Sequence, residues 1–319
     1  MREAFFIKRN RERWQAIAQD DGKHPDEQAD DFIQLVEDLG YSKTFYPQSR
    51  ITKYLNNEAS KKYLGIYKNK RESSSRFVTF FKYTLPLTIS KHHKILLVSF
   101  CLFITFVFIG FFSAKNEQTF VREILGNGYV DMTEKNIRDG KPFQVYGYGN
   151  ELLSFFALFI NNITVSLREF AGGILLGFPT ITGLVYNAVM LGTFEYLFYT
   201  HGLINDSLLT ILIHGTLELF SIVIAATSGL VLAKSWLFPG KKKRIDALKS
   251  GAKDGLIIAL SGFPTLLMAA FFEGFVTRHT DMPLWSKLLI IVSSVSFIVV
   301  YFIVYPIKLK KKRENKLLE

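Results

Sequence analysis

Two ionisable residues, His214 and Glu218, lie four positions apart in LLTILIHGTLELFSIVIAATSGLVL, an apolar run long enough to cross a bilayer. Residues with this spacing share one face of a helix, so the imidazole and the carboxylate are expected to lie side by side. A charge on either residue is costly in hydrocarbon, and such residues usually face a protein interior or a wet cavity. Three uses remain open for the pair: structural pairing, binding of a ligand or ion, and catalysis.

Four further polar residues within the expected spans are candidates for the same site: Glu273, Asn161, Asn162 and Glu195. With the orientation that the lysines and arginines predict, they lie toward the side of the membrane that faces away from the cytoplasm. A histidine with two or three carboxylates can bind a divalent metal, relay protons or hold a polar substrate. It can equally form a hydrogen-bonded network that fixes helix packing, so the sequence identifies neither a metal nor a cofactor.

Familiar catalytic motifs do not account for these residues. HGTLE is not the HExxH motif of zinc proteases, because its glutamate does not lie between two histidines. The P-loop and GxSxG patterns are also absent from the sequence. These observations favour a protein that is not an enzyme.

Two other pairs of residues are expected to have structural roles. Arg168 and Glu169 are adjacent and therefore do not share a helix face, so each is expected to form an ion pair with another helix. Pro179 and Pro264 occur in the related stretches LLGFPT and ALSGFPT. Because proline removes a backbone donor, both are expected to mark helix breaks.

The hydrophobic runs predict an all-α, polytopic membrane protein with about six transmembrane helices. The expected spans are residues 95–112, 153–177, 181–199, 208–233, 255–276 and 285–307. The polar, glycine-rich residues 114–149 are expected to form an exterior loop with short structure. The transmembrane domain as a whole is expected at 94–308, followed by a basic tail at 309–319.

The distribution of charge argues for a membrane surface rather than nucleic acid as the partner. The formal net charge is +11, but the basic residues cluster beside the hydrophobic runs. With six spans, the basic N-terminal region, the 241–253 loop and the C-terminal tail all fall on one side. We therefore expect both termini in the cytoplasm. The single cysteine, Cys101, excludes an intramolecular disulfide.

Residues 1–93 have the character of a cytoplasmic helical region. Three amphipathic or polar stretches, EAFFIKRNRERWQAIAQ, HPDEQADDFIQLVEDLG and PQSRITKYLNNEASKKYLGIYKNK, predict three helices of a small bundle. Gly40 is expected to end the second helix, and Ser49 is expected to cap the third. The basic and aromatic stretch RFVTFFKYTLPLTISKHHK predicts an interfacial helix that leads into the membrane.

Five stretches, spread over nearly the whole chain, form a recognisable pattern: FFIKRNRERW, YPQSRITKYLNNEASKKYLGIY, NNITVSLREFAGGILLGFPT, HGTLELFSIVIAATSGL and FFEGFVTR. This pattern resembles the stage II sporulation protein M family of polytopic membrane proteins. The resemblance implies a multi-pass protein of the bacterial cytoplasmic (inner) membrane. His214, Glu218, Glu273, Asn161 and Asn162 match recurring polar positions of that family, but the resemblance supplies no catalytic residues.

The named member of that family acts during engulfment in spore formers, where it localises peptidoglycan-degrading partner enzymes. The leading expectation is accordingly a non-enzymatic scaffold or anchor for a cell-envelope complex, with the lipid bilayer and other envelope proteins as partners. The sequence leaves open whether the protein forms a homo-oligomer. The alternatives are a transporter or permease-like subunit with a polar site in the outer leaflet, and an intramembrane lipid-processing enzyme.

Overall fold

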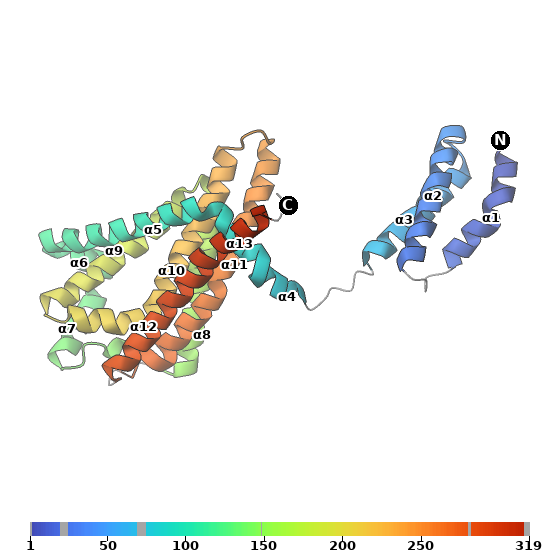
Figure 1. Ribbon diagram of the computed structural model, residues 1–319. Coiled ribbons are helices and arrows are strands. Elements are labelled where there is room, and N and C mark those ends of the chain that lie inside the picture. The colour runs from blue at the N-terminus through green and yellow to red at the C-terminus, as the bar shows by residue number, and fades with distance from the viewer. Residues whose placement is uncertain (1, 20–24, 69–74, 148, 280–281, 316–319) are drawn as a thin grey trace. The chain divides into compact units, whose positions relative to one another are not determined.

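The computed structural model describes residues 2–19, 25–68, 75–147, 149–279 and 282–315, all as helices and short connections (Figure 1). The last four residues of the predicted basic tail, 316–319, lie outside this set. The chain divides into two compact units, Met1–Phe77 and Val78–Glu319. The sequence predicts the boundary between the cytoplasmic region and the membrane domain at residue 93, which is later in the chain than this division. Residue 93 lies inside a long helix, so the stretch 78–93 folds with the membrane unit.

The N-terminal unit contains the three expected helices, α1 (Glu3–Gln19), α2 (Pro25–Phe45) and α3 (Arg50–Lys68). They bury a common core. Its largest member, Trp14, is 1% exposed and donates a hydrogen bond from Nε1 to Asp38 Oδ2 at 2.7 Å. Ser49 Oγ accepts from the Ile51 backbone N–H at 3.2 Å, as expected of a cap.

The expectation that Gly40 ends α2 is wrong, because the helix continues to Phe45. Glycine inside a helix costs about 1 kcal/mol relative to alanine. The extra turn carries Tyr41, whose ring stacks on Phe6 of α1 at a centroid distance of 5.0 Å. Aromatic packing therefore offsets the weak local preference of the glycine.

The membrane unit follows α4 (Ser75–Thr79) and a π-helix, η1 (Phe80–Thr84). Its elements in chain order are α5 (Leu85–Asn116), α6 (Gln118–Leu125), α7 (Asn127–Arg138), the 3₁₀-helix η2 (Gln144–Gly147), α8 (Glu151–Gly172), the 3₁₀-helix η3 (Gly173–Leu175), α9 (Phe178–Thr200), α10 (Ile204–Leu237), α11 (Arg244–Phe271), the π-helix η4 (Phe272–Thr277), α12 (Leu284–Ile298), the π-helix η5 (Val299–Val304) and α13 (Tyr305–Asn315). The all-α, polytopic architecture is confirmed.

Five helical segments of the described chain are long and apolar enough to cross a membrane: Arg76–Asn116, Phe178–Thr200, Ile204–Leu237, Arg244–Thr277 and Leu284–Asn315. The remaining predicted span corresponds to α8, which is not among the five. Its 22 residues give a length of about 33 Å, enough for a bilayer. Its apolar run is interrupted by Asn161, Asn162, Arg168 and Glu169.

Helix α10 is the centre of the membrane unit, in contact with α5, α8, α9, α11 and α12. Helices α5 and α9 pack along each other and diverge from the other long helices toward the end that carries α6 and α7 (Figure 1). The buried core runs between these layers and includes Leu184, Val223, Ile224 and Ile258. Many large apolar side chains of α5 and α12 point outward, as lipid contact requires.

The expected exterior loop, 114–149, is more structured than its composition suggests. It contains α6, α7 and η2; α6 and α7 pack on the end of α9, and η2 contacts η4. Val121 and Val130 are buried together with Leu197 of α9. Phe143 stacks on Phe198 at a centroid distance of 5.4 Å. The segment is therefore a helical cover over that end of the membrane unit.

The two proline positions behave differently. The chain breaks before Pro179, where Leu176 and Gly177 adopt positive φ and α9 begins at Phe178. The expectation of a break at Pro264 is wrong, because α11 continues through it. Within an α-helix, Pro264 removes only the hydrogen bond to the Leu260 carbonyl, and membrane helices tolerate such a loss where their surroundings compensate for it.

Glycines allow the closest helix contacts in the membrane unit. A Cβ at Gly192 of α9 would lie 2.0 Å from the carbonyl oxygen of Val107 on α5. A Cβ at Gly173 would lie 2.2 Å from the carbonyl oxygen of Gly229 on α10. Only glycine permits backbones to approach this closely, as at other interfaces between membrane helices.

We expect Gly192→Ala to destabilise the protein by about 1–3 kcal/mol, because the new methyl group forces α5 and α9 apart. The measurement is the unfolding temperature of the detergent-solubilised protein, followed by fluorescence-detected gel filtration. The matched control is Gly128→Ala in α7, where no atom lies within 4 Å of the added Cβ. Equal unfolding temperatures for the two variants would contradict the close α5–α9 contact.

Candidate functional site

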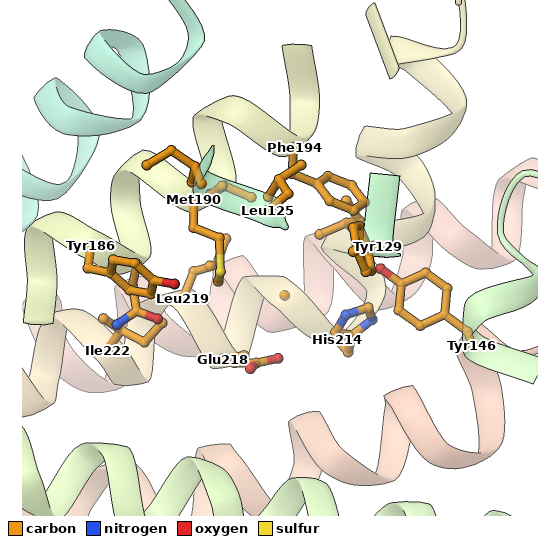
Figure 2. A pocket seen from close by; sticks show the side chains of 15 residues that line it. Leu125, Tyr129, Tyr146, Tyr186, Met190, Phe194, His214, Glu218, Leu219 and Ile222 are labelled. Carbon is orange, nitrogen blue, oxygen red and sulfur yellow. The ribbon is translucent and has the colours of Figure 1, made fainter. Parts of the chain in front are cut away.

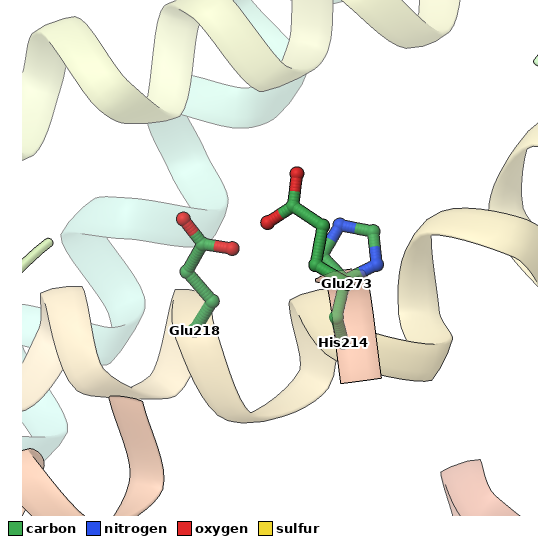
Figure 3. Close-up of side chains that lie close together, drawn as sticks. All are labelled: His214, Glu218 and Glu273. Carbon is green, nitrogen blue, oxygen red and sulfur yellow. The ribbon is translucent and has the colours of Figure 1, made fainter. Parts of the chain in front are cut away.

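The structure brings His214, Glu218 and Glu273 together. The first two project from the same face of α10, as their spacing predicts, and Glu273 comes from η4 at the end of α11. One ligand atom from each residue lies within 4.8 Å of the other two. Figure 3 shows the imidazole and both carboxylates turned toward one another.

Hydrogen bonds from α8 and from η4 hold this cluster in place. Asn162 of α8 donates from Nδ2 to Glu218 Oε1 at 3.0 Å. His214 is 5% exposed, and its Nδ1 is hydrogen-bonded to Thr277 Oγ1 of η4 at 3.0 Å. The other ring nitrogen, Nε2, faces the carboxylates (Figure 3). Three helices, α8, α10 and the π-helical end of α11, therefore fix the geometry.

The cluster borders a cavity of about 360 Å³ between α9 and α10. His214 and Glu218 project into it from α10, opposite Met190 and Phe194 of α9 (Figure 2). The helical cover contributes Leu125, Tyr129 and Tyr146 to the lining. The cavity is therefore mostly apolar and aromatic, with its charged groups on one wall, as in many small-molecule sites.

The two tyrosines outside the membrane spans add hydroxyl groups to this lining. The Tyr146 ring packs edge-on against the His214 ring at a centroid distance of 5.4 Å. Burial raises the pKa of Tyr129 to about 12 and also raises the pKa of Tyr146. Both phenols are therefore protonated at physiological pH and can donate hydrogen bonds.

The electrostatics of the cluster are unbalanced. Two carboxylate charges at 4.8 Å repel by about 3.5 kcal/mol at an effective dielectric constant of 20. Within the described part of the chain, neither Glu218 nor Glu273 forms an ion pair with a lysine or arginine. The nearby Arg278 instead contacts Glu151 at 3.6 Å and the Gly149 carbonyl oxygen at 3.4 Å. A proton or a cation is needed to relieve this repulsion.

Two sequence candidates lie outside the cluster. Asn161 is exposed and donates from Nδ2 to Asn162 Oδ1 at 3.4 Å. Glu195 is buried on α9, and neither of its carboxylate oxygens has a hydrogen-bond partner. Glu195 is thus at the expected depth but is not one of the three clustered ligands.

The expected ion pairs of Arg168 and Glu169 are not found among the described residues. Arg168 is exposed, whereas Glu169 is 4% exposed with both carboxylate oxygens lacking a hydrogen-bond partner. Glu169 lies against α9, where a Cβ added at Gly183 would be 3.2 Å from its Oε1. The Glu169 backbone carbonyl accepts from Thr180 Oγ1 at 2.6 Å. Close helix packing, rather than ion pairing, accounts for this position.

Sequence reasoning missed three residues of the site. Thr277 lies four positions after Glu273, and this spacing could have indicated a shared face. Tyr129 and Tyr146 lie in the segment that reads as a loop. Nothing local in the sequence places them over the cavity, because their position depends on how the cover packs on α9.

Comparison with known protein families decides the affiliation. Residues 99–278, more than half of the chain, match the family described as stage II sporulation protein M. The chain belongs to the stage II sporulation protein M family. The resemblance found in the sequence is thereby confirmed. In this family member the matched segment contains all of α6 to α11 and the whole of the His214, Glu218 and Glu273 cluster.

A second match covers residues 4–68, which correspond to a domain of unknown function, DUF8413. It coincides with α1 to α3 of the N-terminal unit. No curated protein and no solved structure matches the chain.

We expect Glu273→Gln to raise the unfolding temperature in the presence of a chelator at pH 8.5, because the amide removes one of two repelling charges while keeping the shape. Relief of part of the repulsion gives a gain of about 1–2 kcal/mol. Tryptophan fluorescence during heating of the purified protein measures it. Glu123→Gln, at an exposed position of α6, is the control for a change in net charge. A gain of the same size in the control would show that the repulsion is absent.

Proposed function

We propose that this member of the stage II sporulation protein M family is a permease-like membrane protein that binds a small cationic ligand in the cavity between α9 and α10. The observation that carries the proposal is that His214 and Glu218 line one wall of that cavity and that Glu273 joins them in a three-residue cluster. A cavity of about 360 Å³ is within the usual range for small ligands. Glu218 on this wall and Glu273 beside it, neither in an ion pair with a lysine or arginine of the described chain, make the site attractive to positive charge.

The proposal includes a topology with both termini in the cytoplasm. It counts α8 as a sixth crossing, which its length permits. The basic loop before α11 and the basic end of α13 then lie on the cytoplasmic side, in accordance with the positive-inside rule. Helix α10 enters from the outer side at Ile204, and His214 lies about 15 Å along its axis. The cavity then opens toward the outer half of the bacterial inner membrane.

Cysteine accessibility tests this proposal in a Cys101→Ser background. Met190 lines the cavity, so Met190→Cys is expected to react with a membrane-impermeant thiol reagent added to the outside of intact cells. A permease alternates its access, so the same cysteine is also expected to react in inside-out vesicles. Ala226→Cys, at a fully buried core position, is the unreactive control. Failure of Met190→Cys to react from either side would refute the proposal.

A scaffold for a cell-envelope complex is the second candidate function, and the N-terminal unit favours it. This unit has its own hydrophobic core and its own family match, so it has the properties of a separate docking module. In this alternative the membrane unit anchors the module, and the cluster around His214 stabilises the helix packing.

Affinity purification from native membranes separates the two candidates. The chain without residues 1–68 is compared with a His214→Ala/Glu218→Gln double variant and with wild type. For a scaffold, we expect a stoichiometric envelope protein to co-purify with wild type and the double variant, and to be lost from the truncated chain. Absence of such a partner from wild type would contradict the scaffold. Mass spectrometry of the purified samples gives the readout.

A further inference from the structure

We infer that the His214, Glu218 and Glu273 cluster is a binding site for one divalent transition-metal ion, with His214 Nε2 and one oxygen from each carboxylate as ligands. This inference rests on the proposed function, because it names the cation that the cavity binds. The inference also goes beyond the proposed function, because a metal site has defined coordination chemistry that can be measured without knowledge of transport.

The charge of the cluster is the first reason. When both are ionised, the two carboxylates carry a charge of −2, and the described residues place no lysine or arginine in an ion pair with either. A divalent cation reduces the total to zero within a helical membrane domain, where net charge is costly. A monovalent cation would neutralise the cluster only together with a proton on one of the carboxylates.

The arrangement of the donor atoms is the second reason. The three candidate atoms lie within 4.8 Å of one another. Ligands of a tetrahedral zinc site with bonds of about 2.1 Å lie about 3.4 Å apart. The two glutamate side chains can close the remaining difference by rotation. Two of the ligands come from consecutive turns of α10, and the third comes from a π-helix, a type of segment that is frequent at functional sites.

The surrounding hydrogen bonds are the third reason. Thr277 engages Nδ1 of His214 and so leaves Nε2 available for a metal. Asn162 engages one oxygen of Glu218 and leaves the other available. Metal-binding histidines and carboxylates almost always have such outer partners, which orient them toward the ion.

The donor set points to a class of metals. One imidazole nitrogen with two carboxylate oxygens suits Zn²⁺, Mn²⁺ or Fe²⁺, whereas Mg²⁺ and Ca²⁺ prefer oxygen ligands alone. Three protein ligands leave at least one coordination position unfilled. His214 and Glu218 line the cavity together with Tyr129 and Tyr146, so a small molecule in the cavity could reach an ion held by the cluster. An exchangeable ligand such as water can occupy the unfilled position.

Metal titration of the full-length protein in detergent tests the inference. After removal of metals with a chelator, we expect one Zn²⁺ per chain by elemental analysis, and one Co²⁺ with visible d–d absorption bands. Glu218→Gln and Glu273→Gln are each expected to weaken binding by at least 100-fold. Thr277→Val removes only an outer partner of His214 and is expected to weaken it by about 10- to 100-fold.

The matched control is Glu195→Gln, which removes a buried carboxylate of α9 that is not among the three ligands. It is expected to retain the wild-type affinity and spectrum. Zn²⁺ is also expected to raise the unfolding temperature of wild type but not of Glu273→Gln. The inference is overturned if wild type binds no stoichiometric metal, or if all three glutamine variants bind it equally. Gel filtration of each variant confirms that loss of binding is not loss of folding.

The proposal of a metal site and the proposal of a permease can be refuted independently. Accessibility of Met190→Cys without metal binding would reject the metal and keep a cavity for another ligand. Metal binding without accessibility of Met190→Cys would keep the site as a structural metal centre and reject the permease.

Discussion

A charged group inside a bilayer is stable only where protein groups or water replace its lost hydration, and this requirement governs the membrane unit. Helix α10 carries His214 and Glu218 and is surrounded by α5, α8, α9, α11 and α12. Each polar atom of the pair has a partner or a place on the cavity wall. Asn162 engages Glu218, Thr277 engages His214, and Glu273 completes the group. The neighbours of α10 are therefore arranged around its polar face as well as its apolar one.

Close packing makes this arrangement possible. Gly173 and Gly229 bring the α8 end and α10 into backbone contact, and Gly229 also lies against the carbonyl of Glu169. At this separation, short side chains can bond between helices. Thr180 Oγ1 reaches the Glu169 carbonyl, and Ser221 Oγ lies 2.7 Å from Thr265 Oγ1. In hydrocarbon there is no hydrophobic force between helices, so such contacts carry much of the specificity of packing.

The sequence predicted what depends on local periodicity and length. The apolar runs gave the long helices, and the spacing of His214 and Glu218 gave their shared face. Pairing between distant elements was not accessible in the same way. The expected depth in the membrane grouped Glu195 with the cluster, but the structure does not bring its carboxylate together with the other three side chains. Pro264 carries the same local motif as Pro179, yet only Pro179 follows residues with positive φ at a chain break. Tertiary packing decided both cases.

The two ends of α10 are separated by a continuous buried segment. Between Glu218 and Lys234, most residues of α10 are buried, over about 24 Å of helix. Past the Lys234 end of this segment, Asp254 of α11 contacts two residues of α5. Its Oδ2 lies 2.5 Å from Lys91 Nζ and 3.0 Å from His92 Nε2, and α5 is kinked at His92.

This core separates the cavity from the basic end of the unit, so the proposed permease would need helices to rearrange before a ligand could pass. The chain offers interruptions in regular helix for such a change at η3, η4 and η5. Of these, η4 carries Glu273 itself, so a ligand bound to Glu273 would contact a segment with irregular backbone bonding. A ligand that draws Glu273 toward α10 would therefore act on η4, which also contacts α8 and α10.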